Sequence, residues 1–182
     1  MQVANEKKKN NIAEYVLYMW QLEDLLRAFQ FDIEQLEKNV FTRFSESETL
    51  REEIYQWYSN LTQMMEMESI KEIGHLQITK NVMLDLNTLH VQLLKSPEEI
   101  KYRELYYKAA PNLYEFQKKI EDKDTNEVEM MFLGLYGLLM MRINKRNITE
   151  ETELAMKTFS DQLAMLSQKY HEREEKEKTE WI

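Results

Sequence analysis

Cysteine is absent from this chain, and its 182 residues include only three glycines and two prolines. The missing cysteine excludes disulfides, thiolate catalysis and cysteine-ligated metal sites. So few glycines and prolines leave little turn chemistry for a sheet and no glycine-rich phosphate loop. A chain of this length buries roughly 70% of its unfolded surface, so it needs no covalent or metal cross-link. We therefore expect one all-helical domain over residues 1–182.

Positive charge is also scarce, since 24 lysines and arginines stand against 33 acidic residues. An acidic chain binds the negatively charged phosphates of nucleic acids poorly. The most apolar segment, from Met130 to Met141, is shorter than the ~20 residues that a membrane span requires. Charged residues interrupt the stretch from Ile12 to Leu26, which argues against a signal peptide. We expect a soluble, cytoplasmic protein with no nucleic-acid partner, no membrane partner and no cofactor.

What the chain does contain is apolar residues spaced three and four apart, the pattern of helices that bury one face. The pattern predicts six or seven helices in an antiparallel bundle. The segment from Met130 to Met141 is apolar on all sides, so we expect it to form the buried central helix, with Gly134 and Gly137 admitting close neighbours. The expected helices cover residues 12–29, 33–44, 50–64, 73–93, 97–120, 128–143 and 150–170. Residues 171–182 are highly charged and are predicted to form a solvated or frayed tail.

Several boundaries follow from capping residues. Asp32 and Gln35 form a capping-box pattern, which favours a break or kink near Phe31 over one long helix. Ser47 and Thr49 are both candidate caps of the next helix, Thr49 in a capping-box pattern with Glu52, and Ser96 with Pro97 predicts another helix start. Pro111 removes one backbone hydrogen bond, but the apolar phase continues across it, so we expect a kink there and not a reversal.

The first long helix carries the candidate polar site. Arg27 lies four residues after Glu23 and three after Asp24, so both carboxylates are within reach of one guanidinium. Glu23 lies on the inner flank of the helix and, if buried, requires a partner. We favour a structural ion pair that fixes helix register. The alternative is a polar pocket in which Glu23 and Arg27 meet Glu14, His75 and a small ligand.

Two arrangements of histidine in the sequence are candidate metal sites. His75 and His90 are expected on one helix, where fifteen residues separate them by ~22 Å, too far to share an ion. We expect each ring to be buried or half-buried against a carbonyl or carboxylate. Glu72 and His75 form a Glu-x-x-His pattern, but one such match is expected by chance in a glutamate-rich chain. No metal site and no catalytic residue is predicted beyond this weak candidate.

The stretch from Asn11 to Phe29, with Gly74-His75-Leu76 and Leu89-His90 downstream, resembles an uncharacterised family of small all-helical bacterial proteins. That family is known only as a domain of unknown function. The similarity covers about residues 5–170. It implies a helical protein of unassigned activity and supplies no catalytic residue.

The functional hypothesis is a non-catalytic interaction or scaffold protein, expected to form a homodimer. Its 12 methionines and its aromatic residues (3 Trp, 10 Tyr and 7 Phe) suit adaptable contact surfaces. The stripe from Met156 to Tyr170 is expected to extend into a dimer seam. The alternative is a bundle that binds a small molecule or metal in a polar pocket between the first and fourth predicted helices, with catalysis as an option.

Overall fold

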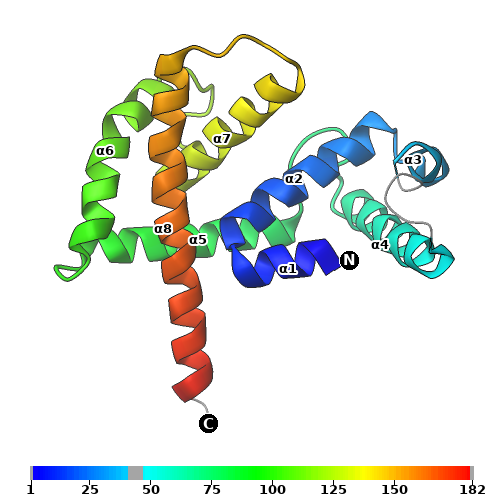
Figure 1. Ribbon diagram of the computed structural model, residues 1–182, viewed down its shortest axis with the longest axis horizontal. Coiled ribbons are helices and arrows are strands. Elements are labelled where there is room, and N and C mark those ends of the chain that lie inside the picture. Colours follow the sequence, from blue (N-terminus) through cyan, green and yellow to red (C-terminus); the bar gives the residue numbers. More distant parts are fainter. Residues whose placement is uncertain (1, 41–46, 181–182) are drawn as a thin grey trace. The chain divides into compact units, whose positions relative to one another are not determined.

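The computed structural model describes residues 2–40 and 47–180 and is all-α (Figure 1). The described residues form eight helices and no strand, which confirms the predicted class and exceeds the predicted helix count. The helices are α1 (Gln2–Asn10), α2 (Ile12–Ala28), α3 (Ile33–Asn39), α4 (Glu48–Met67), α5 (Gln77–Lys95), α6 (Ile100–Gln117), α7 (Glu127–Ile143) and α8 (Glu150–Glu180). Of these helices, none combines the length and apolar character that a membrane span would require.

The chain divides into two compact units. Unit 1 comprises Met1–Lys9 and Glu14–Asn81, and unit 2 comprises Asn10–Ala13 and Val82–Ile182. Each unit is described by itself below. The prediction of one domain over the whole chain stays a prediction.

Helix α1 was not predicted, because its only buried side chain is Ala4 and it has no apolar stripe. Its separation from α2 rests on Asn11, whose Oδ1 accepts a hydrogen bond from the Ala13 N–H at 3.1 Å. The Ser167 hydroxyl donates to the same oxygen at 2.9 Å and accepts from the Ile12 N–H at 3.1 Å. Asn11 thus caps α2 in the manner that its side chain favours.

The predicted break near Phe31 is confirmed. Gln30 and Phe31 have φ values of 53° and 63°, which end the α2 helix. Asp32 then accepts a hydrogen bond from the Gln35 N–H at 3.0 Å and starts α3. The predicted continuation to Phe44 lies outside the described residues.

Around α4 and α5, two predictions are wrong. Helix α4 begins at Glu48, with the candidate Ser47 at the N-cap position, so the candidate Thr49 lies inside the helix and does not cap it. The predicted helix over residues 73–93 begins only at Gln77, and residues 68–76 form a connection that contains His75. The reason is local, because Gly74 has a φ of 102°, which no helix accommodates.

Helix α6 also starts later than predicted, at Ile100, so Pro97 is not its first residue. The guanidinium of Arg103 donates hydrogen bonds to the carbonyls of Ser96 and Pro97, and this holds the preceding turn outside the helix. The helix continues through Pro111 without a reversal, as predicted.

Helix α7 packs against α6 and α8, but it is not the fully buried central helix that the sequence predicted. Its residues beyond Gly134 are mostly half-buried, and Gly137 is exposed, because its neighbours cover only part of its circumference. At Gly134 the predicted close approach is confirmed, since a Cβ there would lie 2.9 Å from the Phe159 ring. At Gly137 the prediction is wrong, since a Cβ would meet nothing within 4 Å.

The last helix, α8, begins after Thr149, whose hydroxyl accepts from the Thr152 N–H at 3.2 Å, as its predicted capping role requires. The apolar stripe of α8 is buried within unit 2 and comprises Met156, Phe159, Leu163 and Leu166. The charged tail continues the helix to Glu180, and residues 175–179 are exposed. Residues 171–174 are half-buried, and Arg173 pairs with Asp85 at 2.6 Å, so the exposed part of the tail begins at residue 175.

Candidate functional site

Glu23 on α2 is fully buried and holds the connection between α4 and α5. Its Oε2 lies 2.6 Å from Nδ1 of His75, and its Oε1 accepts the Leu76 N–H at 3.1 Å. A buried carboxylate is stable only when its oxygens are hydrogen-bonded. Glu23 meets that condition with two donors from one loop, so it acts as an anchor for that loop.

Trp20 completes this anchor from one turn earlier on α2. Its indole stacks on the His75 ring, with centroids 4.1 Å apart and planes inclined by 13°. Trp20 is buried, whereas the His75 side chain is 30% exposed. The ring is therefore fixed on one face by the indole and at Nδ1 by Glu23, and the loop conformation is specified by α2.

The side chain of Arg27 binds backbone carbonyl groups of the same connection. Its guanidinium donates to the carbonyls of Ile70, Lys71 and Gly74, and Nη1 lies 2.9 Å from Asp24. Of the two predicted pairs, that of Arg27 with Asp24 is confirmed, whereas that of Arg27 with Glu23 is wrong, because Glu23 pairs with His75. Helical spacing permits either pairing, and the loop carbonyls decide between them.

Of the six residues predicted for a polar site, four gather at this loop: Glu23, Asp24, Arg27 and His75. Glu14 does not join them, since its exposed carboxylate pairs with Lys7 at 2.9 Å. His90 lies on α5 in unit 2. Glu72 is exposed beside His75, and within residues 2–40 and 47–180 no group of three metal-ligating side chains is arranged around a common point.

A second polar cluster, in unit 2, surrounds His90, which is 1% exposed. Nδ1 lies 2.6 Å from the Tyr102 hydroxyl, and Nε2 lies 3.1 Å from the Glu127 carboxylate. The Tyr106 hydroxyl donates to the other oxygen of Glu127 at 2.8 Å. The buried ring predicted for His90 is thus confirmed. Both of its nitrogens are engaged within the protein, so this imidazole has no nitrogen available for a metal or substrate.

The sequence patterns did not predict the other three members of this cluster, Tyr102, Tyr106 and Glu127. Tyr102 and Tyr106 lie four residues apart on α6, and that spacing was the signal for a shared polar face. Hydrogen bonds from His90 and Tyr106 lower the pKa of Glu127. Burial and the nearby Glu127 raise the pKa of Tyr106 to about 12. The cluster therefore holds an ionised carboxylate and neutral phenols near neutral pH.

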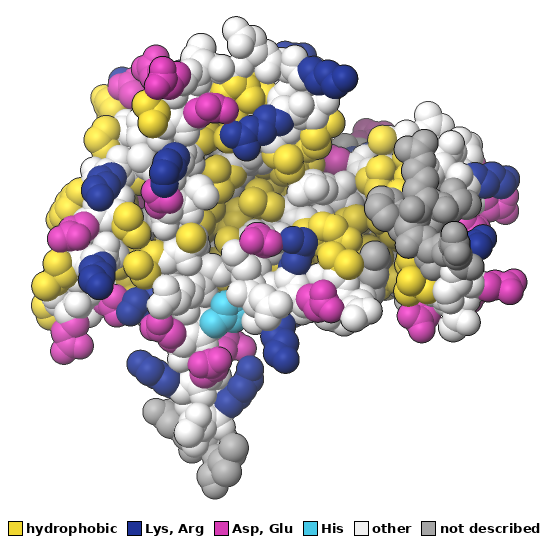
Figure 2. Space-filling model, viewed as in Figure 1, with side chains coloured by type: hydrophobic (Ala, Val, Ile, Leu, Met, Phe, Trp, Pro, Cys, Tyr) yellow, Lys and Arg dark blue, Asp and Glu magenta, His cyan; other side chains and the backbone are white. Residues whose placement is uncertain are grey.

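The outer face of α6 is different in character, because its apolar residues point to solvent. Ile100, Tyr107 and Tyr114 recur at seven-residue intervals and are 59%, 69% and 63% exposed. Pro111, also exposed, falls on the same face. We call these four residues the α6 stripe. In Figure 2 hydrophobic side chains interleaved with charged ones follow the edge of the molecule that α6 forms.

Charged residues on this face are ordered along the helix. Glu104 lies in the first half of the stripe and Lys118 follows its end, fourteen residues later, and both are exposed. Lys118 also covers the ring of Tyr114, with Nζ 4.1 Å from the centroid. Two copies of α6 in antiparallel orientation would set each Glu104 near the other copy's Lys118. Within its own helix Lys118 pairs with Glu115 at 2.7 Å.

Comparison with known proteins gives a family and no function. The model of a family described as Domain of unknown function (DUF4924) matches residues 1–177. No curated protein and no solved structure matches the chain.

Proposed function

This chain belongs to the DUF4924 family, whose function is unassigned, and on that premise we propose that it is a non-catalytic helical interaction protein that forms a homodimer through the α6 stripe. The observation that supports the proposal is the row of exposed apolar side chains at Ile100, Tyr107 and Tyr114. Single exposed apolar residues are ordinary on a protein surface, but three large ones that recur on one face of a helix suit an interface.

Tyrosine at the middle of the stripe suits this role, because aromatic residues are enriched where protein surfaces meet. Tyr107 and Tyr114 give large contact areas with few rotatable bonds, so ordering them on association costs little entropy. A two-fold axis near Pro111 would bring each stripe against its own copy, which is the symmetry of most homodimers.

The dimer seam predicted on α8 is not the surface we propose. Met156, Phe159 and Leu163 are buried against other helices of unit 2 and have no side-chain area left for a partner. The apolar residues of α6 are exposed, so the proposed interface lies there.

The proposal extends to compartment and origin. We propose a cytoplasmic location, which suits a chain without cysteine. Bacterial origin stays a prediction from the resemblance.

Light scattering during size-exclusion chromatography tests the dimer. We expect a mass near 44 kDa, twice the 22.2 kDa of one chain, at high micromolar concentration. Tyr107→Glu places a charge in the stripe and should return the mass to that of one chain. Leu84→Glu is the matched control, because Leu84 on α5 is 66% exposed and lies off the stripe. A wild-type mass of one chain, or equal dissociation of the control, would refute the proposal.

A further inference from the structure

Unit 1 contains an apolar cavity of about 550 Å³ that plays no part in the loop anchor at Glu23. Cavities that bind small organic molecules span roughly 300–1,000 Å³. The described residues that line it are Gln2, Val3, Tyr18, Leu22, Leu25, Val40, Leu50, Glu53, Ile54 and Tyr58. All of them belong to unit 1, so the cavity is a property of that unit alone.

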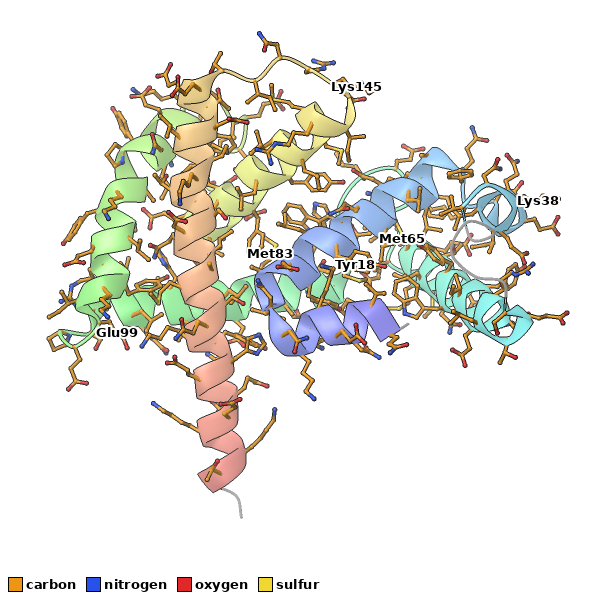
Figure 3. The ribbon with its side chains drawn as sticks, in the orientation of Figure 1. Tyr18, Lys38, Met65, Met83, Glu99 and Lys145 are labelled. Atoms are coloured by element: carbon orange, nitrogen blue, oxygen red, sulfur yellow. The ribbon has the colours of Figure 1, made fainter. Side chains whose placement is uncertain are left out.

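Helical spacing explains how its walls form. Tyr18, Leu22 and Leu25 form one stripe on α2 at intervals of four and three residues. Leu50, Ile54 and Tyr58 form the corresponding stripe on α4 at intervals of four. In Figure 3, Tyr18 lies on the side of α2 that faces α1, and Val3 of α1 contributes to the same wall.

The polar groups of the lining set the chemistry of a ligand. Glu53 is the one charged residue among the described lining residues, and its carboxylate is exposed. Tyr58 adds an aromatic ring that attracts cations through its face, and at Tyr18 the Nζ of Lys7 already lies 5.8 Å from the ring centroid. Burial raises the pKa of both tyrosines, so their hydroxyls stay neutral at physiological pH. The cavity therefore combines apolar walls with negative charge at its margin.

We propose that this cavity binds an apolar amine, a molecule with an aliphatic or aromatic body and one protonated amino group. The body would occupy the space between the α2 and α4 stripes, and the ammonium group would lie near Glu53. Binding of this kind does not depend on association through the α6 stripe, because the two surfaces belong to different units.

Fluorescence of the neutral apolar probe N-phenyl-1-naphthylamine tests the cavity itself. We expect saturable binding to the full chain at one probe per chain. Leu50→Trp, which puts an indole into the cavity, should weaken probe affinity at least tenfold. Ile78→Trp is the matched control, because Ile78 and Leu50 are both 39% exposed and Ile78 does not line the cavity. Absence of saturable binding, or equal weakening by both variants, would overturn the proposal.

Displacement of the bound probe tests the charge of the ligand. Octylamine and octanoate have the same chain length and opposite charge at pH 7. We expect octylamine to displace the probe at a concentration at least tenfold lower than octanoate. Glu53→Gln should remove that preference, because it replaces the carboxylate that would pair with the ammonium group. Equal displacement by the two compounds from the wild-type protein would overturn the proposal.

Discussion

The two histidine–carboxylate pairs of this protein have opposite patterns of burial. In unit 1 the carboxylate of Glu23 is fully buried and the His75 side chain is 30% exposed. In unit 2 the ring of His90 is 1% exposed and the carboxylate of Glu127 is 38% exposed.

This difference shows what each pair contributes. Glu23 receives two hydrogen bonds from one connection, so removing it releases a loop. His90 bridges Tyr102 and Glu127 from two other helices, so removing it loosens contacts between helices. A buried charge requires partners more strongly than a buried neutral ring does. We therefore expect the unit 1 pair to contribute more to stability.

The largest effect is expected for Glu23→Ala. The variant leaves the Leu76 N–H and His75 Nδ1 without their partner and creates a void, which should lower the free energy of unfolding by about 3 kcal/mol. Chemical denaturation measures the loss. Asp24→Ala is the control, because Asp24 is 46% exposed and its exposed pair contributes less than about 1 kcal/mol. Equal losses in the two variants would contradict the anchoring role of Glu23.

An intermediate effect is expected for His90→Leu. The variant leaves the buried Tyr102 hydroxyl without its His90 partner, and we expect a loss of about 2 kcal/mol. The double variant His90→Leu/Tyr102→Phe replaces both polar partners by apolar groups. It should cost clearly less than the sum of the two single variants, because no unpaired hydroxyl remains. If the stability loss of the double variant equals the sum of the losses of the two single variants, this hydrogen bond does not couple His90 and Tyr102.

The smallest effect is expected at Glu127, through its dependence on pH. Because the folded protein lowers the pKa of Glu127, its stabilising contribution is present above the ordinary pKa of about 4.3 and is lost as pH falls through the lower, folded value. The contribution should stay below about 1 kcal/mol, since the side chain is partly exposed. Between pH 5 and pH 3, the free energy of unfolding of Glu127→Gln should fall less steeply than that of the wild-type protein. An unchanged acid dependence would show that Glu127 is not a source of it.

A capping residue predicted the start of a helix correctly only where its side chain accepts a backbone N–H group. Asp32 and Thr149 accept backbone N–H groups at the starts of α3 and α8, as predicted. Thr49 has the same capping pattern but lies inside α4. At Ser96, bonds from Arg103 fix a turn in place of the predicted cap. A local capping pattern does not report such contacts from side chains several residues away.

The candidate site was predictable in its members and not in its pairings. The burial of Glu23 followed from its position on the inner flank of α2, and it was confirmed. Its bond to His75 was not predictable, because 52 residues separate the two and the prediction placed His75 inside a helix. Gly74 with its positive φ was the residue that redirected the chain there.

The order of the residues alone determined that this protein is helical and that Glu23 lies on the buried flank of its helix, because both conclusions depend on spacing along one helix. Tertiary structure decided which partner each buried group found, which glycine admitted a neighbour, and which apolar stripes stayed in contact with water. Those outcomes depend on how much of each helix its neighbours cover. The exposed face of α6 and the open space between α2 and α4 are the parts left uncovered, and both proposed binding surfaces lie there.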